Sequence, residues 1–308
     1  MTYDQRELGI GAGIWVSGIS LIVASYICLS MIYENRKHRY FYEAQKMLDF
    51  IYFAPIIIGW PTWVIILLGN EGGIFEYIVD IYKAMIFYFL ISYVLAMIGR
   101  ISDGKGYVYN QEKMINSFLS IERTGFFFLF CGKIKLRNKK WVKSFLFYVR
   151  LISVLYIVTY ICIFIAILLL LYVDGDNLHY GEIDPNYGYF WINITIICVT
   201  ILSSHALYTF IHTIKKIPNL KGFRIKSKFY IIEVFAMLIQ VQPLIFSAFA
   251  EWNWISDNDK YETDEIASFT SNFILCIEMV IFAFMLKVLF PYTDYIPSTD
   301  SSNEPLKI

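Results

Sequence analysis

Charged residues are scarce in this sequence, and neither sign is in excess. Only 17% of the 308 residues are charged, and 26 basic residues balance 26 acidic ones to a net charge of zero. Soluble domains carry about 25% charged residues, so this composition excludes an ordinary soluble globule. A balanced charge also lacks the basic field that attracts nucleic acid, and we expect no nucleic-acid partner.

The motifs of common catalytic and metal sites are missing as well. The sequence has four histidines and five cysteines, with no Cys-x-x-Cys pair, no Gly-rich phosphate loop and neither a Gly-x-Ser-x-Gly nor a His-Glu-x-x-His motif. His205 and His212 are seven residues apart, on one face of a helix, but a metal site needs a third ligand. We therefore expect no enzyme, no metal and no cofactor.

What the sequence has in abundance is apolar residues, which make up 57% of it and give a mean hydropathy of +0.54. A bilayer core about 30 Å thick is crossed by a helix of about 20 apolar residues. Seven stretches meet this length and predict an all-α membrane protein with seven transmembrane helices. They are Gly9–Ile32, Asp49–Leu68, Glu76–Ile98, Phe145–Val173, Gly188–Ile214, Phe229–Ala250 and Ile266–Phe290.

Basic residues predict the orientation of these helices. They gather in the loops after the first, third and fifth stretches, whereas the second and fourth loops have none and the sixth has only Lys260. By the positive-inside rule, the N-terminus lies outside and the C-terminus is cytosolic. We expect one seven-helix domain over residues 1–292, with a cytosolic loop at 100–143, and a disordered cytosolic tail at 293–308.

The cytosolic loop contains an amphipathic segment. Met114, Ile115, Phe118 and Leu119 fall near helical spacing. This pattern is typical of a helix that lies on the membrane surface, and equally of a segment folded against the bundle. The spacing alone leaves both alternatives open.

Polar residues inside membrane helices are costly, so they are candidates for function. Glu278 lies in the middle of the seventh stretch, and Gln242 and Pro243 lie together in the sixth. Each is either a group facing a solute cavity or a packing group bonded to a neighbouring helix. Asp80 and Lys83 are three residues apart on one helical face, which indicates a self-neutralising pair, with an anion contact at Lys83 as the alternative.

Several short patterns appear in order along the stretches. They read Tyr82-x-Ala84-x-x-x-Tyr88, Trp191-x-Asn193-x-Thr195 and Gln242-Pro243-Leu244-Ile245-Phe246-Ser247, with Glu278 in the seventh stretch. Together they resemble the α subunit of the organic solute transporter, a seven-span family that moves steroid and bile-acid conjugates. The family carries a lipidated cysteine cluster before its fourth span, where this sequence has Cys131 alone beside a basic run, which leaves one candidate lipidation site.

The resemblance implies facilitated transport of amphipathic organic anions together with a small single-span β subunit. Membrane lipid and a second copy of the chain, in a homo-oligomer, are further partners to consider. The expected location is the plasma membrane, with an internal membrane as the alternative. The candidates for the substrate path are Tyr82, Tyr88, Asn193, His205, Gln242, Pro243 and Glu278, with Lys83 as an anion contact.

Two other functions fit the same helices. One is a membrane-trafficking or membrane-organising protein of the same fold. The other is a seven-transmembrane receptor, which shares the outside N-terminus. Against a receptor, the outer loops lack a cysteine pair, the third stretch ends in Ile-Gly-Arg-Ile-Ser rather than an Asp-Arg-Tyr triplet, and the seventh ends in Phe-Pro-Tyr-Thr-Asp-Tyr rather than Asn-Pro-x-x-Tyr.

Overall fold

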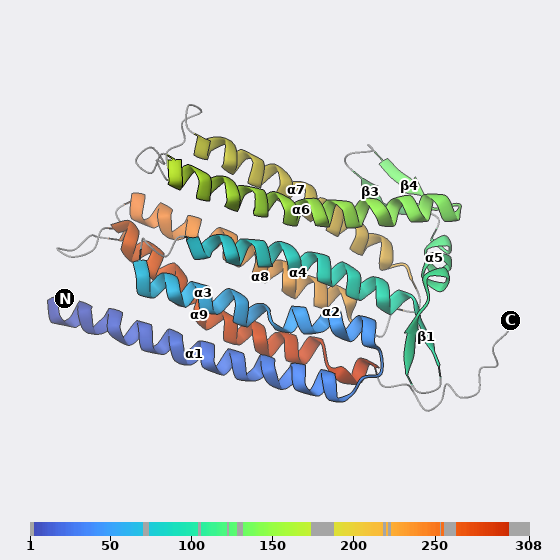
Figure 1. Cartoon of the computed structure of the whole chain (residues 1–308), viewed down its shortest axis with the longest axis horizontal. Helices are drawn as coiled ribbons and strands as arrows, with labels where there is room; N and C mark the ends of the chain where they lie inside the picture. Colours follow the sequence, from blue (N-terminus) through green and yellow to red (C-terminus); the bar gives the residue numbers. More distant parts are fainter. Residues whose placement is uncertain are drawn as a thin grey trace. The chain divides into compact units, whose positions relative to one another are not determined.

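The structure is a computed structural model, and it describes residues 3–69, 74–103, 106–121, 123–127, 132–173, 188–217, 220, 223–252, 254–255 and 263–295. These residues form long helices and two small two-stranded sheets (Figure 1). The helices are α1 (Tyr3–Lys37), α2 (Tyr42–Tyr52), α3 (Ala54–Leu68), α4 (Ile74–Ile98), α5 (Gln111–Leu119), α6 (Lys139–Val173), α7 (Gly188–Ile214), α8 (Ile225–Glu251), α9 (Thr263–Leu289) and the 3₁₀ helix η4 (Tyr292–Tyr295). The strands are β1 (Arg100–Ser102), β2 (Tyr107–Tyr109), β3 (Arg123–Phe127) and β4 (Gly132–Lys135).

Among the described residues, six helical segments are long and apolar enough to cross a membrane: Ile10–Lys37, Tyr42–Leu68, Phe75–Ile98, Lys139–Leu169, Ile225–Glu251 and Glu265–Asp294. They support six of the seven predicted spans. In α7 the described apolar part, Cys198–Ile214, is shorter, so the fifth of the predicted spans, Gly188–Ile214, stays a prediction. Large apolar side chains point outward from these helices, with Trp15 76% exposed and Leu244 70% exposed. Such surfaces are stable against lipid rather than against water.

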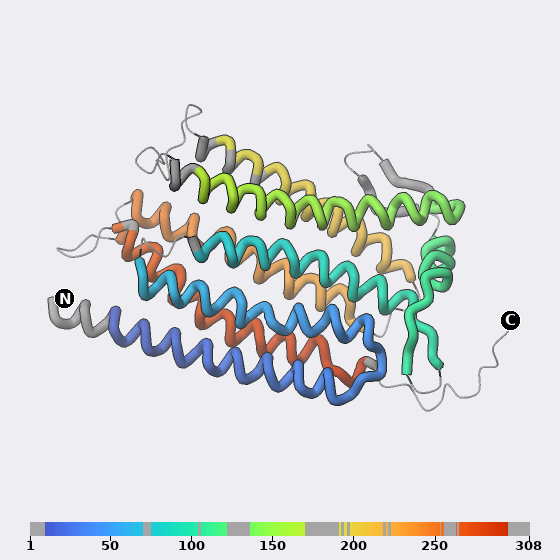
Figure 2. Tube along the Cα trace, viewed as in Figure 1, coloured from blue at the N-terminus to red at the C-terminus, as the bar shows by residue number. Residues whose placement is uncertain are grey.

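The second predicted stretch consists of two consecutive helices, α2 and α3. Between them, Phe53 donates its N–H to the carbonyl of Asp49 at 3.1 Å, and its own carbonyl accepts from Ile56 and Ile57 at 3.0 Å each. Pro55 has no N–H to give to the helical ladder, which explains why the helix is interrupted here. The trace of α2 still runs on into α3 (Figure 2), so the pair forms one candidate span.

The chain is organised in two compact units. Unit 1 consists of Met1–Ile86, Ser102–Val108 and Phe223–Ile308, and unit 2 consists of Phe87–Ile101 and Tyr109–Gly222. In unit 1, α9 packs against α1, α3 and α8, and α1 also packs against α3 (Figure 1). In unit 2, α6 packs against α7 and α5. The single seven-helix domain over residues 1–292 stays a prediction.

One end of unit 1 holds the turn after α1, the start of α8 and the end of α9 together. The hydroxyl of Tyr52 donates to the carbonyl of Phe290, and the rings of His38 and Tyr292 stack with centroids 4.9 Å apart. These contacts bring the predicted first loop to the same end of unit 1 as the last described residues. Which side of the membrane this end faces stays a prediction.

The end of α9 is followed by η4 rather than by loose chain. Residues 293–295, where the tail was predicted to begin, belong to η4. The reason is an ion pair: Asp294 accepts from Nζ of Lys228 in α8 at 2.6 Å. Residues 296–308 lie outside the described residues, so the disordered tail stays a prediction for them.

The amphipathic segment of the cytosolic loop is α5. Its first turn is capped by Asn110, whose Oδ1 accepts from the N–H of Lys113 at 2.9 Å. Met114, Ile115 and Phe118 are buried, and the ring of Phe118 lies 6.1 Å from that of Phe145 in α6. The segment is therefore folded against α6, the second of the two alternatives, and its apolar face is occupied by protein.

The strands β1 and β2, which flank a turn before α5, were not predicted. At the start of β2, the N–H of Tyr107 donates to the carbonyl of Tyr40 at 2.6 Å, which fixes this strand to the turn between α1 and α2. Gly106 lies against the same carbonyl so closely that a Cβ there would overlap its oxygen. A glycine is required at this point because only a residue without a side chain permits the approach.

Candidate functional site

Five of the predicted site residues lie in unit 1, namely Tyr82, Lys83, Gln242, Pro243 and Glu278. They come from three helices, α4, α8 and α9. Since α8 and α9 pack against each other, polar residues on their facing sides can form a site together.

Lys83 in α4 is a buried cation with a carboxylate partner. Its side chain is 3% exposed, and Nζ donates to Oδ1 of Asp80, one turn earlier on the same helix. A buried ammonium without a partner costs several kcal/mol, so the carboxylate stabilises it. The predicted pair is therefore present. An anion contact at Lys83 stays a prediction.

A small cavity lies beside Lys83. Its volume is about 10 Å³, which is on the order of one water molecule. The walls are apolar and come from α3, α4, α8 and α9: Ile58, Ile86, Ile232, Phe235, Ile239 and Phe282 among them. In this conformation the cavity admits no organic solute, because ligand pockets have volumes of about 300–1,000 Å³.

The contact between α8 and α9, which we call the α8–α9 seam, carries most of the remaining candidates. At one end, the rings of Phe235 and Phe282 stack with centroids 4.2 Å apart. At the other, Nε2 of Gln242 donates to the backbone carbonyl of Ser271 at 2.9 Å. Glu278 lies on α9 one turn before Phe282 and two turns after Ser271, so it shares their helical face, and it is half-buried. The seam therefore joins an apolar stack to two polar side chains.

Two oxygen atoms on the α8–α9 seam are buried without a hydrogen-bond partner among the described residues. They are Oε1 of Gln242 and Oε2 of Glu278. A buried polar atom left unpaired costs about 1–3 kcal/mol, and native structures tolerate few of them. These two oxygens can accept hydrogen bonds from hydroxyl or amide groups of a bound molecule. This makes the α8–α9 seam the strongest candidate site in unit 1.

Pro243 follows Gln242 directly and is exposed on α8. A proline has no N–H, so the carbonyl of Ile239, one turn back, has no helical donor at this point. The helix nevertheless continues from Ile225 to Glu251. The freed carbonyl belongs to a residue that lines the cavity beside Lys83, which links the proline to that cavity.

Tyr82 joins α4 to α2. It is 6% exposed, and its hydroxyl donates to the carbonyl of Phe50 in α2. This bond fixes the start of α4 to α2. The hydroxyl is therefore already engaged in the described conformation.

The other predicted residues are in unit 2 or outside the described residues. Tyr88 in α4 and His205 in α7 are half-buried within unit 2. The side chain of Asn193 and the whole of Cys131 lie outside the described residues, so their predicted roles remain predictions. Across the described part of the chain, no group of three His, Cys, Asp or Glu residues could hold a metal ion.

The sequence did not reveal the ion pair at the end of unit 1. Lys228 is 1% exposed, yet it is paired with Asp294 and lies 5.0 Å from the centre of the Phe290 ring. The two charges are 66 residues apart, and no local spacing marks them as partners. The sequence offers one signal of this pair, a basic residue directly before the apolar stretch Phe229–Ala250, and a lysine in that place is equally typical of a cytosolic loop.

Comparison with known proteins matches the chain to a family model and to a curated relative. A family model described as organic solute transporter Ostalpha matches residues 13–295. A transmembrane protein 184 homolog from Dictyostelium discoideum is 23% identical over 137 residues, which cover 44% of this chain and 26% of the relative. The chain thus aligns with about a quarter of that relative's length. No solved structure is significantly similar to the chain.

Proposed function

This chain belongs to the organic solute transporter Ostalpha family, and from that membership we propose that it is the multi-span subunit of a transporter for amphipathic organic anions, such as steroid or bile-acid conjugates. The membership confirms the resemblance found in the sequence patterns. Together with the apolar helices, it makes the chain a multi-span integral membrane protein of a transporter family rather than of an enzyme family. The family match over residues 13–295 is the observation that carries the proposal.

We place the solute path at the α8–α9 seam. A flat apolar solute suits a wall of stacked phenylalanine rings, and a few polar groups suffice to orient it. Phe235 and Phe282 offer the rings, and the unpaired oxygens of Gln242 and Glu278 offer acceptors for its hydroxyl groups. Lys83, beside the same helices, offers a positive charge for a sulfate or carboxylate once Asp80 is displaced.

Transport through this path requires the helices to move. The cavity beside Lys83 is about 10 Å³, far below the volume that an organic anion needs. We propose that the described conformation is a closed one and that α8 separates from α9 when solute enters. The bond from Gln242 to the Ser271 carbonyl is the polar contact that must then open.

The proposed transporter also includes a small single-span β subunit, and it moves solute down its gradient at the plasma membrane. An internal membrane is the alternative location. Both the partner and the direction come from the family resemblance. They are tested together with the solute.

The test is uptake of a labelled steroid sulfate and a labelled bile acid by cells that express this chain, with and without a candidate single-span partner. We expect saturable uptake that needs both chains and continues after ATP depletion. Uptake that is absent although both chains reach the cell surface would contradict the proposal and favour the trafficking alternative. Signalling through G proteins on ligand addition would favour the receptor.

Two substitutions test the path. We expect Gln242→Ala and Glu278→Ala each to lower uptake about tenfold, the effect of one lost buried hydrogen bond, at unchanged surface expression. Gln240→Ala is the matched control, because Gln240 lies on α8 two residues earlier and therefore on another face. Normal uptake by both variants would remove the α8–α9 seam from the path.

A further inference from the structure

A cleft of about 240 Å³ lies between the last turn of α1 and the start of α2. Three of its lining side chains are cations, Arg36, Arg39 and Lys46. Aromatic rings line it as well: Tyr42, Phe50 and Phe53. All of these residues belong to unit 1, and the cleft lies where the first two candidate spans meet.

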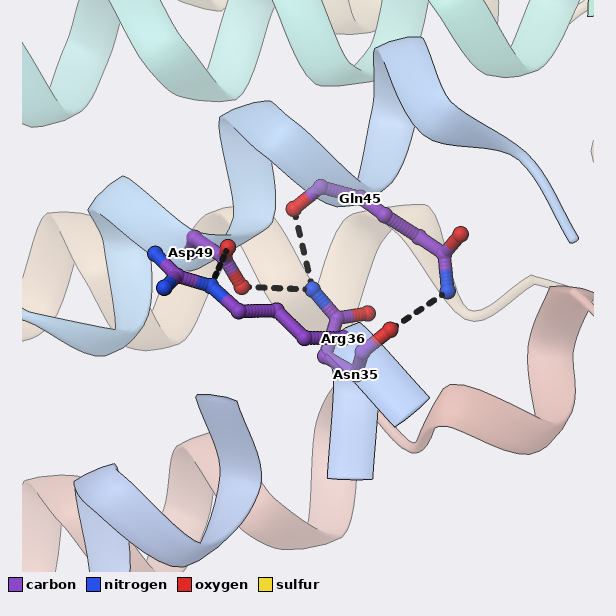
Figure 3. Close-up of polar contacts among 4 residues, drawn as sticks. All are labelled: Asn35, Arg36, Gln45 and Asp49. Carbon is purple, nitrogen blue, oxygen red and sulfur yellow. Dashed lines mark hydrogen bonds and ion pairs between the residues drawn. The ribbon is translucent and has the colours of Figure 1, made fainter. Parts of the chain in front are cut away.

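A hydrogen-bond network fixes the shape of the cleft (Figure 3). Nδ2 of Asn35 donates to the carbonyl of Gln45 at 2.9 Å and to Oδ1 of Asp49 at 2.7 Å. Nε2 of Gln45 donates back to the carbonyl of Asn35 at 3.1 Å, and Nε of Arg36 donates to Oδ2 of Asp49 at 2.9 Å. The two helices are joined by these bonds, so the cleft is formed before any ligand binds.

The cleft has an excess of positive charge. Asp49 is its one lining carboxylate, and both oxygens of Asp49 are already occupied by Asn35 and Arg36. Arg39 and Lys46 are exposed and form no ion pair with any described residue. Two positive charges therefore remain available to an anion.

One of the lining residues, Asn35, also carries a buried acceptor. Asn35 is 1% exposed, and its Oδ1 has no hydrogen-bond partner among the described residues. An inorganic phosphate at neutral pH is chiefly an acceptor, whereas a phosphorylated sugar alcohol presents hydroxyl donors beside its phosphate. The combination of two available cations and one buried acceptor matches a phosphorylated polyol.

The volume of the cleft and its place beside exposed aromatic rings indicate which part of a ligand enters it. A volume of about 240 Å³ is below the range for whole drug-sized ligands, so it suits a headgroup whose acyl chains stay outside. The exposed rings of Tyr42 and Phe50 are of the kind found at the level of lipid headgroups. Basic pockets between membrane helices on the cytoplasmic side commonly hold such headgroups.

We propose that the cleft between α1 and α2 binds the phosphorylated inositol headgroup of an inner-leaflet lipid. The lipid phosphate contacts Arg39 and Lys46, and an inositol hydroxyl donates to Oδ1 of Asn35. The site is separate from the α8–α9 seam and does not depend on which solute is carried. It does depend on the predicted orientation, with the turn after α1 in the cytosol.

The test uses the full chain purified in detergent, with phosphatidylinositol monophosphate labelled on an acyl chain as the probe and fluorescence anisotropy as the readout. At about 1 kcal/mol for each basic residue near a headgroup, the double variant Arg39→Gln/Lys46→Gln should bind about 30-fold more weakly. Lys37→Gln is the matched control, since Lys37 is an exposed neighbour that does not line the cleft. It should bind like the wild type.

Two competitors distinguish an inositol lipid from a free inositol phosphate and from another anionic lipid. Soluble inositol phosphate should displace the probe only at much higher concentration than the unlabelled lipid, and phosphatidylserine at equal headgroup charge should displace it poorly. Equal affinity of the double variant and the wild type would overturn the proposal. So would an equal loss in Lys37→Gln, displacement by phosphatidylserine as effective as by the inositol lipid, or displacement by inositol phosphate as effective as by the lipid.

Discussion

The buried pair of Lys228 and Asp294 allows a quantitative prediction. The side chain of Lys228 is 1% exposed and that of Asp294 is 24% exposed, with 2.6 Å between Nζ and Oδ2. Breaking a buried pair on one side costs about 3–5 kcal/mol, because the remaining charge is left without its partner in a poorly hydrated place. The two halves of this pair are not equally hydrated, so the two single substitutions should not cost the same.

We expect Asp294→Asn to lower the free energy of unfolding by about 3 kcal/mol, because the ammonium left behind is buried. Lys228→Met should cost about 2 kcal/mol, because the partly exposed carboxylate regains water and methionine keeps contact with the Phe290 ring. The double variant contains neither charge and should cost about 2 kcal/mol rather than the sum of the two. The coupling between the two sites is then about 3 kcal/mol.

The measurement is unfolding of the purified chain in mixed micelles, followed by circular dichroism, for the wild type and the three variants. The order of the two single variants tests the exposure argument, and the double variant tests the coupling. Additive losses would refute an energetic link between α8 and η4. A loss for Asp294→Asn smaller than that for Lys228→Met would refute the hydration argument.

Two further substitutions test a close backbone contact and a surface ion pair. Gly106→Ala should destabilise the contact with the turn after α1 by about 1–3 kcal/mol, because its Cβ overlaps the backbone carbonyl of Tyr40. Faster hydrogen exchange in β2 would report this loss, and Gly11→Ala, with open space around it, should leave that exchange unchanged. The hydrogen bond from Lys139, 2.8 Å away, and its positive charge lower the pKa of Glu112. The stabilisation that the ionised Glu112 gives the fold is therefore present above the unfolded pKa near 4.5, and it is lost as the pH falls through the lower folded pKa. The melting temperatures of the wild type and of Glu112→Gln should then differ slightly at neutral pH and become equal in acid.

The long apolar runs made the helices predictable, while the polar ends of several helices were not predictable. The stretch Gly188–Ile214 coincides with α7, because its boundaries are sharp changes of composition. By contrast, α2 begins at Tyr42, seven residues before the predicted Asp49. The residues between them are too polar to count as apolar chain, and they are helical because Ala44 and Leu48 are buried. The burial of such residues against other helices cannot be predicted from composition.

In the candidate site too, contacts between residues close in sequence were predictable, whereas contacts between distant residues were not. Asp80 and Lys83 were predictable as a pair because three residues along a helix place side chains on one face. The partner of Gln242 is a backbone carbonyl on another helix, and every residue offers such a carbonyl, so no sequence pattern selects it. The strands before α5 had one usable signal, an Asp-Gly pair at Asp103 between two short extended runs.

The bonds that join α1 to α2 also bear on the order in which the protein assembles. The polar contacts drawn in Figure 3 link residues no more than 14 positions apart. The first two membrane helices can therefore close as a hairpin while the ribosome is still making the rest of the chain, since local contacts form early. The centre of unit 1 is α9, the last long helix to be synthesised, and it packs against α1 and α3. A chain released before α9 would keep its first hairpin and would lack the helix that completes the core of unit 1.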